Sequence, residues 1–267
     1  MRLQGVILDW AGTTVDYGCM APVRAFMDIF MSAGIQLTME EVRAPMGLLK
    51  WDHIREMLEM PRIGKLFEGR MGRPYTNEDV DLMHEQFEPK LMNGLQHFSH
   101  PLPSVVEVVE RLRADGLKIG ATTGYNDEMM RIVAGTAGDG GYAPDYWVSP
   151  DSVGGKGRPY PYMIYANMIR LDMGLPAQVV KVGDTASDMQ EARNAGVWAV
   201  GVLKGSSMLG LSEEEISSMS APALGELMDK ARQRFIEHGA HDVIESLSHL
   251  PDRIERINHR LQEGDRP

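Results

Sequence analysis

Five short apolar runs recur along the chain, separated by segments with helical spacing, and this alternation is the feature that most constrains the fold. Runs that are apolar throughout are typical of strands buried on both faces of a parallel sheet. Strands that alternate with helices build βαβ units. We therefore expect an α/β protein with a doubly wound, Rossmann-like parallel sheet. The predicted strands are residues 4–8, 117–123, 145–149, 178–183 and 197–202.

Several helices of this core have readable ends. Residues 105–116 carry valines and a leucine at positions i, i+3, i+4 and i+7, and Gly116 ends the pattern. Ser212 and Glu215 have the spacing of a capping box. Residues 220–239 and 246–263 have the pattern of two further helices, whereas the glycines of 135–141 predict a flexible loop.

Between the first and second predicted strands the pattern changes. No apolar run there resembles a strand, and amphipathic segments occupy residues 21–34, 38–44, 50–59 and 76–95. Thr76 and Asp79 have the spacing of a helix cap. We therefore expect an all-helical domain at 20–98, inserted into an α/β core made of 1–19 and 99–267.

Charge and composition exclude some classes of partner. The 267 residues include 27 Lys and Arg against 38 Asp and Glu, a formal charge of −11, which disfavours nucleic acid and anionic membranes. No window has the roughly 18 uncharged apolar residues of a membrane span, and the first residues lack the apolar core of a secretory signal. The single cysteine, Cys19, excludes an intrachain disulfide. We expect a cytoplasmic protein that acts on a small molecule.

Acidic, hydroxyl and cationic residues follow the ends of the predicted strands. Ligands of open parallel sheets bind beyond the carboxyl ends of the strands, so these residues should converge. A carboxylate nucleophile, hydroxyl donors, a cation and metal-binding carboxylates suit phosphoryl transfer. Each aspartate taken alone is more often a turn or a helix cap, and it is the ordered set that favours a site. The four segments are 9–14, 122–125, 157–161 and 183–188.

These segments, read as D-x-x-G-T, a later apolar residue with Thr, a basic residue before Pro, and G-D-x-x-x-D, resemble the motifs of the haloacid dehalogenase superfamily. The resemblance implies that Asp9 is the nucleophile and forms an aspartyl phosphate. It also implies that Thr123 and Arg158 hold the phosphoryl oxygens, with Arg158 preferred to the neighbouring Lys156 for its forked geometry. The helical insertion would be the cap domain of this superfamily.

The same resemblance implies a magnesium site. Asp9, Asp184 and the backbone carbonyl of Ala11 would ligate Mg²⁺. Asp188 begins a predicted helix, and we expect it to position the site rather than to bind the metal directly. No organic cofactor is implied.

Residue 11 departs from the superfamily pattern, because its phosphatases and mutases typically carry Asp there, as the acid that protonates an alcohol leaving group. With Ala11, a phosphate-ester hydrolase would lose a factor of about 10²–10⁴. Lys50 offers another route: it lies among apolar residues, which lower the pKa of an amine. A neutral amine attacks an aldehyde to form an imine, and the protonated imine accepts the electron pair of a breaking C–P bond.

The combination resembles the phosphonoacetaldehyde hydrolase (phosphonatase) family, which hydrolyses phosphonoacetaldehyde to acetaldehyde and phosphate. The resemblance implies a homodimer that requires Mg²⁺, with a mobile cap that carries Lys50 and excludes water when it closes. The matching segments are 9–18, 46–50, 122–125, 157–161 and 183–185.

Other residues are predicted to contact the substrate or to assist Lys50. His53 lies one helical turn after Lys50 and is either a structural histidine or a proton shuttle. Cys19 either packs or touches the substrate, and Met46 either shields Lys50 from water or belongs to the core. The predicted substrate contacts are Gly12, Thr13, Cys19, Met46, Gly124 and Tyr125.

Two other functions remain open from the sequence. One is a magnesium-dependent phosphate-ester hydrolase or phosphomutase of the same superfamily, against which Ala11 argues. The other is a non-catalytic binding protein on this fold, which the presence of Asp9, Asp184 and Arg158 disfavours.

Overall fold

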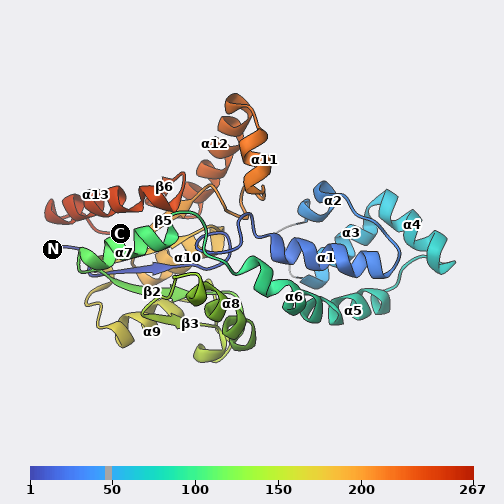
Figure 1. The fold of residues 1–267 in the computed structure, drawn as a ribbon, viewed down its shortest axis with the longest axis horizontal. Coiled ribbons are helices and arrows are strands. Elements are labelled where there is room, and N and C mark those ends of the chain that lie inside the picture. The colour runs from blue at the N-terminus through green and yellow to red at the C-terminus, as the bar shows by residue number, and fades with distance from the viewer. Residues whose placement is uncertain (46–49) are drawn as a thin grey trace. The chain divides into compact units, whose positions relative to one another are not determined.

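The computed structural model describes residues 1–45 and 50–267, which divide into two compact units (Figure 1). One unit comprises Met1–Cys19 with Ser99–Pro267, and we call it the core unit. The other comprises Met20–Phe98, and we call it the helical unit. None of the described helices combines the length and the apolar character needed to cross a bilayer.

The core unit contains a parallel sheet, which confirms the predicted α/β fold class. Among the described residues the sheet has six strands in the order β3-β2-β1-β4-β5-β6, and every neighbouring pair is parallel. The chain therefore leaves β1 toward one edge and returns to its other side with β4, which creates a topological switch point beside β1. The strands are β1 Gly5–Leu8, β2 Lys118–Thr122, β3 Tyr146–Val148, β4 Val179–Gly183, β5 Trp198–Val202 and β6 Asp242–Ile244.

Helices cover both faces of this sheet. α9 packs on β2 and β3, α10 packs on β4 and β5, and α7 packs on β2 and α13. In Figure 1, α7 and α13 lie on one side of the sheet and α9 on the other. The helices are α7 Val105–Ala114, α8 Asp127–Asp139, α9 Tyr162–Leu171, α10 Ala186–Ala195, α11 Glu213–Ser218, α12 Ala221–Glu237 and α13 Leu250–Gln262. Short 3₁₀ turns lie at Asp151–Val153, Pro176–Gln178 and Leu247–His249.

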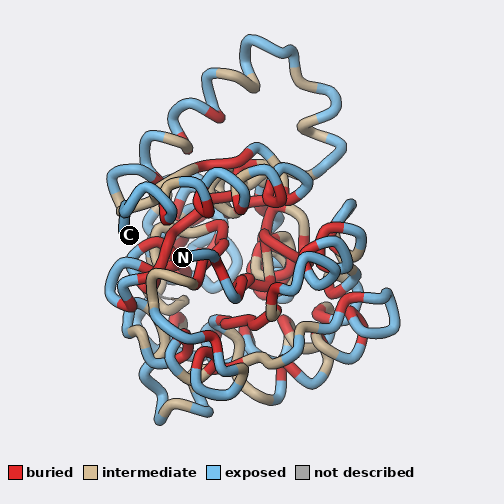
Figure 2. The backbone as a smooth tube through the Cα atoms, turned by 90° about the vertical axis from the view of Figure 1, so that its left-hand side faces the viewer, coloured by how far each residue is buried: buried red, intermediate tan, exposed pale blue. Residues whose placement is uncertain are grey.

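The core is concentrated in the central strands. Every residue of β1, β4 and β5 is buried, and Figure 2 shows the buried backbone gathered in the interior. Apolar side chains of α9, α10 and α12 pack with strand residues in one cluster that includes Ile164, Met189 and Phe235. Burial on both faces explains why these strands are apolar runs rather than alternating ones.

Register places the candidate residues at one edge of the sheet. Leu8 of β1 pairs with Ala121 of β2 on one side and with Val182 of β4 on the other. Asp9, Thr122 and Gly183 are each one residue further along their strands. The carboxyl ends of the three central strands therefore deliver their following residues to the same place.

Two details of the core differ from the sequence prediction. A sixth strand, β6, lies between the two predicted C-terminal helices; with only two apolar residues, Val243 and Ile244, it forms no apolar run that the sequence would show. The glycine-rich segment 135–141 was predicted as a loop, but α8 extends to Asp139. The buried side chains of Thr136 and Ala137 anchor this last turn, so packing outweighs the poor helix propensity of glycine.

The helical unit contains only helices and turns among its described residues. α1 packs on α6, and α3 packs on α4 and α5. Thr38 with Glu41 and Thr76 with Asp79 form capping boxes, the second as predicted. The predicted segment 76–95 is two helices, because Pro89 has no N–H to donate to the carbonyl of Glu85. The helices are α1 Met20–Ser32, α2 Met39–Arg43, α3 Lys50–Glu59, α4 Pro61–Met71, α5 Asn77–Glu85 and α6 Phe87–Leu95, followed by a 3₁₀ turn at Gln96–Phe98.

Candidate active site

Asp9 begins a tight loop at the end of β1. The carbonyl of Trp10 accepts hydrogen bonds from the N–H groups of Thr13, Thr14 and Val15, which folds the loop back on itself. Gly12 has φ +80°, and a Cβ there would lie 2.3 Å from Oδ2 of Asp184. Glycine is therefore required at position 12 both by its backbone conformation and by the close approach of the Asp184 carboxylate.

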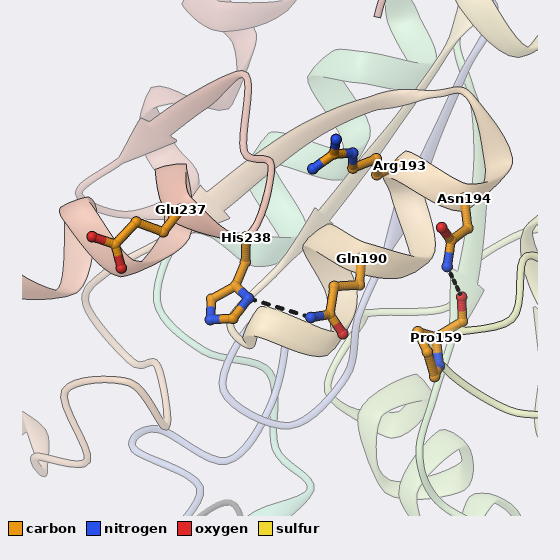
Figure 3. Close-up of a pocket in the computed structure, with 6 residues that line it drawn as sticks. All are labelled: Pro159, Gln190, Arg193, Asn194, Glu237 and His238. Carbon is orange, nitrogen blue, oxygen red and sulfur yellow. Dashed lines mark hydrogen bonds between the residues drawn. The ribbon is translucent and has the colours of Figure 1, made fainter.

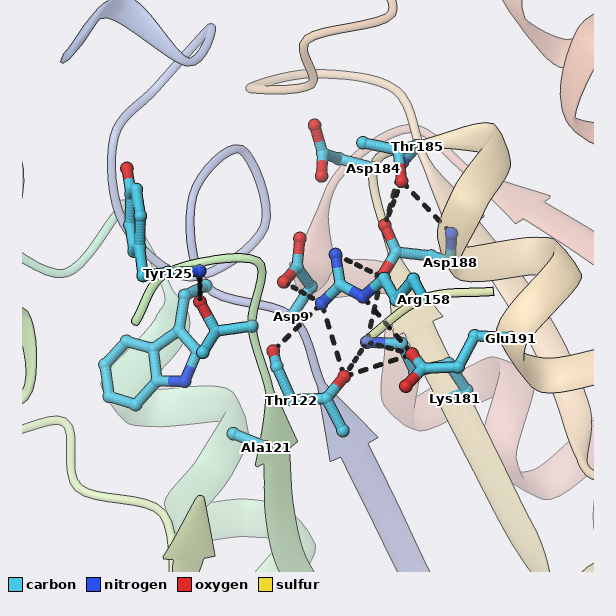
Figure 4. Close-up of polar contacts among 12 residues, drawn as sticks. Asp9, Ala121, Thr122, Tyr125, Arg158, Lys181, Asp184, Thr185, Asp188 and Glu191 are labelled. Carbon is cyan, nitrogen blue, oxygen red and sulfur yellow. Dashed lines mark hydrogen bonds and ion pairs between the residues drawn. The ribbon is translucent and has the colours of Figure 1, made fainter. Parts of the chain in front are cut away.

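Arg158 joins the ends of three elements (Figure 4). Its Nη2 pairs with Oδ1 of Asp9 and lies 3.0 Å from the carbonyl oxygen of Thr122. Its Nη1 lies 3.1 Å from Oδ1 of Asp188, and its Nε lies 3.3 Å from Oε2 of Glu191. Although burial alone would lower it, the three carboxylates hold the pKa of Arg158 above its usual value. The guanidinium is therefore a fixed cation beside the predicted nucleophile.

Asp184 has one oxygen held and one open. Its Oδ2 accepts hydrogen bonds from the N–H of Ser207 at 2.8 Å and from the Ser207 hydroxyl at 2.6 Å, and lies 3.6 Å from Sγ of Cys19. Its Oδ1 is buried and has no hydrogen-bond partner among the described residues. Burial, and then the nearby carboxylates of Asp9 and Asp188, raise the pKa of Asp184 well above its usual value.

These features fit a hard divalent cation. Carboxylate oxygens of Asp9, Asp184 and Asp188 lie within 4.8 Å of one another. The cluster holds four carboxylates and two cationic side chains, so with all groups ionised it has two negative charges in excess, which a divalent cation balances. Oxygen ligands and incomplete protein coordination are typical of Mg²⁺. The six groups are Asp9, Asp184, Asp188, Glu191, Arg158 and Lys181.

Asp188 is occupied by other partners. Its Oδ2 accepts from the Thr185 N–H at 3.1 Å and from the Thr185 hydroxyl at 2.5 Å, as the N3 residue of a capping box. Its Oδ1 lies 2.9 Å from Nζ of Lys181. Although burial raises it, the cations Arg158 and Lys181 bring the pKa of Asp188 below its usual value. Asp188 is thus an ionised carboxylate whose oxygens are already engaged.

Hydroxyl and thiol groups lie on the segments that follow β1 and β2. The hydroxyl of Thr13 is buried and has no hydrogen-bond partner among the described residues, so it is available to a ligand. The hydroxyl of Thr123 accepts from the N–H of Tyr125 at 3.0 Å. Burial and then the carboxylate of Asp184 raise the pKa of the Cys19 thiol, and burial and then Asp16 raise that of the Tyr125 phenol. Both groups are therefore neutral near pH 7.

Lys50 and His53 lie together in the helical unit. Nζ of Lys50 is 5.8 Å from the ring centroid of Phe26 and 5.5 Å from that of Phe87. The ring of His53 stacks on Phe26 with centroids 3.9 Å apart, and its Nε2 lies 2.9 Å from the carbonyl oxygen of Val42. Burial lowers the pKa of His53 to about 4, and the charge of Lys50 contributes in the same direction. Nε2 of the neutral ring therefore donates to Val42, which leaves Nδ1 as an acceptor.

A model of the haloacid dehalogenase-like hydrolases matches residues 3–196. A phosphonoacetaldehyde hydrolase of Bacillus cytotoxicus is 54% identical over 257 residues, which cover 96% of this chain and 97% of the relative. The chain belongs to the phosphonoacetaldehyde hydrolase family.

Other members of the phosphonoacetaldehyde hydrolase family and its structural relatives agree. A bifunctional phosphonoacetaldehyde hydrolase/aminoethylphosphonate transaminase of Clostridioides difficile is 48% identical over 99% of this chain and 41% of the relative. A crystal structure of a phosphonoacetaldehyde hydrolase-like protein of Oleispira antarctica superposes with a TM-score of 0.85 at 36% identity, covering 100% of this chain and 96% of that one. The family resemblance predicted from the sequence is confirmed.

The structure brings most of the predicted core residues of this phosphonoacetaldehyde hydrolase family member to one edge of the sheet. Asp9, Asp184 and Asp188 converge on a candidate metal site, and Arg158 contacts Asp9. Lys156 instead lies 5.6 Å from the ring centroid of Tyr162. Met46 lies outside the described residues. The individual catalytic, metal and substrate roles stay predictions.

Sequence reasoning missed three polar residues of the site. Lys181 is in the middle of β4 and fully buried, and Glu191 of α10 is fully buried beside it. A lysine within an otherwise apolar strand was the available signal for the first. Ser207, which holds Asp184, follows β5 in a loop without a motif, so nothing in the sequence pointed to it.

A hollow lies beside α10 and is bordered by Pro159, the residue after Arg158 (Figure 3). Its volume is about 330 Å³. Nδ2 of Asn194 donates to the carbonyl of Pro159 at 2.8 Å, which ties the segment that carries Arg158 to α10. The lining residues are Pro159, Gln190, Arg193, Asn194, Glu237 and His238.

The depressed pKa of His53 predicts a pH-dependent stability. The unfolded state titrates near pH 6.5 and the folded state near 4, so the unfolded chain binds more protons between these values. The contribution of His53 to the free energy of unfolding has its full value above pH 6.5. It falls as the pH decreases toward 4 and levels off below pH 4. We expect a loss of up to about 3 kcal/mol from this group.

Denaturant unfolding of the wild type and of His53→Gln at a series of pH values measures this effect. Glutamine does not titrate and retains a donor for Val42, so its free energy of unfolding should fall less steeply between pH 6.5 and 4. Parallel curves for the two proteins would show that His53 does not remain neutral in the folded state.

Proposed function

We propose that this protein hydrolyses the C–P bond of phosphonoacetaldehyde to give acetaldehyde and phosphate. The observation that carries the proposal is the 54% identity to a phosphonoacetaldehyde hydrolase over nearly the whole of both chains. The core geometry supports it, because a carboxylate, a fixed guanidinium and a carboxylate cluster meet at one sheet edge. Ala11 supports it as well, since it provides no acid for an alcohol leaving group.

Lys50 supplies the electron sink of the proposed reaction. Its neutral amine attacks the aldehyde carbon, and loss of water leaves a protonated imine. The π faces of Phe26 and Phe87 stabilise a cation at this nitrogen. We assign to the unpartnered Nδ1 of His53, one helical turn after Lys50 on α3, the acceptance or return of a proton during imine formation.

Asp9 acts as the nucleophile. An oxygen of its carboxylate attacks phosphorus. The C–P electron pair becomes the C=C bond of an enamine while the π pair of the protonated imine moves to the Lys50 nitrogen. The enamine therefore leaves without an acid to protonate a leaving oxygen. Arg158 stabilises the negative phosphoryl oxygens, and the hydroxyls of Thr13 and Thr123 donate to them. The enamine takes a proton on carbon and is hydrolysed to acetaldehyde and Lys50, while water releases phosphate from Asp9.

A magnesium ion fits this arrangement. Asp9, Asp184 through its open Oδ1, and the carbonyl of Ala11 would hold it, with Asp188 positioning the site. When bound, Mg²⁺ supplies positive charge that favours attack of one anion on another. Cys19, as a neutral thiol directed at Asp184, orients that carboxylate and borders the substrate with Gly12, Gly124 and Tyr125.

The organisation of the chain completes the proposal. Residues 20–98 act as the cap domain, and residues 1–19 with 99–267 act as the catalytic core. The substrate aldehyde reacts with Lys50 of the cap and the phosphonate with Asp9 of the core. We also propose that the protein is a cytoplasmic homodimer. The family resemblance implies the dimer, and sedimentation of the purified protein tests it.

The activity is tested by incubating the protein with phosphonoacetaldehyde and Mg²⁺. We expect acetaldehyde and inorganic phosphate in equal amounts, and loss of both when a chelator removes the metal. Sugar phosphates serve as the comparison. Turnover of sugar phosphates without release of acetaldehyde from the phosphonate would instead identify a phosphate-ester hydrolase.

A further inference from the structure

Two fully buried charged residues lie behind Arg158 and have no part in the proposed chemistry. Nζ of Lys181 lies 2.9 Å from Oδ1 of Asp188, 3.7 Å from Oε2 of Glu191 and 2.8 Å from the hydroxyl of Thr122. The Thr122 hydroxyl in turn donates to Oε2 of Glu191 at 3.2 Å. Figure 4 shows Lys181 of β4 and Glu191 of α10 on one side of the guanidinium and Asp9 on the other.

Stability is a poor explanation for this arrangement. Moving charges out of water costs desolvation free energy, which their mutual attraction seldom exceeds. Well-packed apolar residues in the same place are often at least as stabilising. Both side chains have no exposed surface. A lysine on the central strand β4 and a glutamate on α10 therefore call for another reason to be charged.

Their geometry relative to Arg158 provides one. Each nitrogen of the guanidinium has its own carboxylate: Nη2 has Asp9, Nη1 has Asp188 and Nε has Glu191. A planar fork held on three edges cannot rotate without breaking an ion pair. Lys181 contacts the two carboxylates behind the guanidinium, so it holds them in place and balances their charge.

We infer that Glu191 and Lys181 are positioning residues that fix Arg158 with its Nη2 edge toward Asp9 and the phosphonate. The inference rests on the proposed function for the identity of the substrate. It adds that the phosphoryl site is aligned from behind by a buried ion-pair network. Asn194, also on α10, holds the backbone next to Arg158, so one helix anchors both the side chain and its segment.

The decisive variant is Glu191→Gln, which keeps the size of the side chain and removes its charge. We expect kcat to fall about 10–100-fold, because positioning of a transition-state contact is lost, with a smaller change in KM. The Kd of inorganic phosphate, measured by calorimetry with Mg²⁺ present, should rise about tenfold. Reductive trapping of phosphonoacetaldehyde on Lys50 should remain at the wild-type level, since Lys50 lies in the other unit.

Lys181→Met tests the second residue and should show the same pattern with a larger loss, because it leaves three carboxylates to Arg158 alone. The matched controls are Glu255→Gln, whose side chain forms an exposed ion pair with Arg2 at 3.6 Å, and Lys118→Met, at the opposite end of β2. Both controls should keep kcat and phosphate affinity within about twofold of the wild type.

A purely structural role predicts a different result. Folded Glu191→Gln with kcat and phosphate affinity equal to those of Glu255→Gln, and a lower melting temperature only, would overturn the inference. If Glu191→Gln does not fold, Glu191→Asp retains the charge but withdraws the carboxylate by one methylene, and the same criteria apply to it. A wild type that binds phosphate but releases no acetaldehyde would refute the proposed function, while the phosphate affinities would still test the inference.

Discussion

Replacing Asp9 with asparagine is expected to abolish release of both acetaldehyde and phosphate. An amide oxygen cannot form the aspartyl phosphate, so the covalent route is lost rather than slowed. Removal of a nucleophile costs about 10⁴–10⁶-fold in enzymes that depend on one. The measurement is kcat for phosphonoacetaldehyde at saturating Mg²⁺, with the limit of detection set well below a thousandth of the wild-type rate.

The Asp9→Asn protein should remain folded. Asp9 is one of four carboxylates in a cluster with only two cations, and it raises the pKa of Asp184. Removing its charge therefore relieves repulsion even though Arg158 loses one partner, so we expect a melting temperature in the absence of metal no lower than that of the wild type. Reductive trapping on Lys50 should persist. Substantial turnover by this variant would show that another group attacks phosphorus.

The sheet could be predicted because its physics is local. β1, β2, β4 and β5 are almost entirely buried, which favours apolar runs, and the end of each run indicates where the next polar residue lies. Asp9, Thr123 and Asp184 could therefore be placed at one edge from the sequence alone. β6 could not, since it contains only two apolar residues, Val243 and Ile244, whereas the equally short β3 is apolar throughout.

The residues that orient the site were harder to predict because their contacts exist only in the tertiary structure. Glu191 is one polar residue among several on α10, and only the fold shows that it faces Arg158 rather than solvent. Ser207 is comparable, since a serine in a loop carries no sign of the carboxylate that it will hold. The residues that react can be recognised from sequence motifs, whereas the residues that orient them can be recognised only from their contacts in the folded structure.

Lys50→Arg is expected to remove turnover of phosphonoacetaldehyde while leaving the core chemistry in place. Arginine keeps a positive charge near Phe26 and Phe87, but its guanidinium remains protonated and does not form an imine. Without the imine the C–P electron pair has no acceptor and the leaving group is an unstabilised carbanion. We expect a loss of at least about 10⁴-fold in kcat, comparable to removal of a nucleophile.

Borohydride trapping separates this explanation from a general loss of structure. Wild-type protein incubated with phosphonoacetaldehyde and reductant should gain one reduced two-carbon adduct at Lys50, found by peptide mass analysis. Lys50→Arg should gain none and should bind Mg²⁺ and inorganic phosphate as the wild type does. The exposed Lys65→Arg on α4 is the matched control and should retain turnover.

The Asp9→Asn and Lys50→Arg variants test the two halves of the proposed reaction separately. Lys50 and Asp9 belong to different units, so a variant in one unit leaves the other able to perform its own half-reaction. Asp9→Asn should form the imine and stop before phosphorus is attacked, and Lys50→Arg should bind the phosphoryl group and stop before the C–P bond breaks. An Asp9→Asn protein that accumulates no trapped adduct, or a Lys50→Arg protein that still releases acetaldehyde, would show that the aldehyde does not react at Lys50. Another side chain would then have to react with the aldehyde.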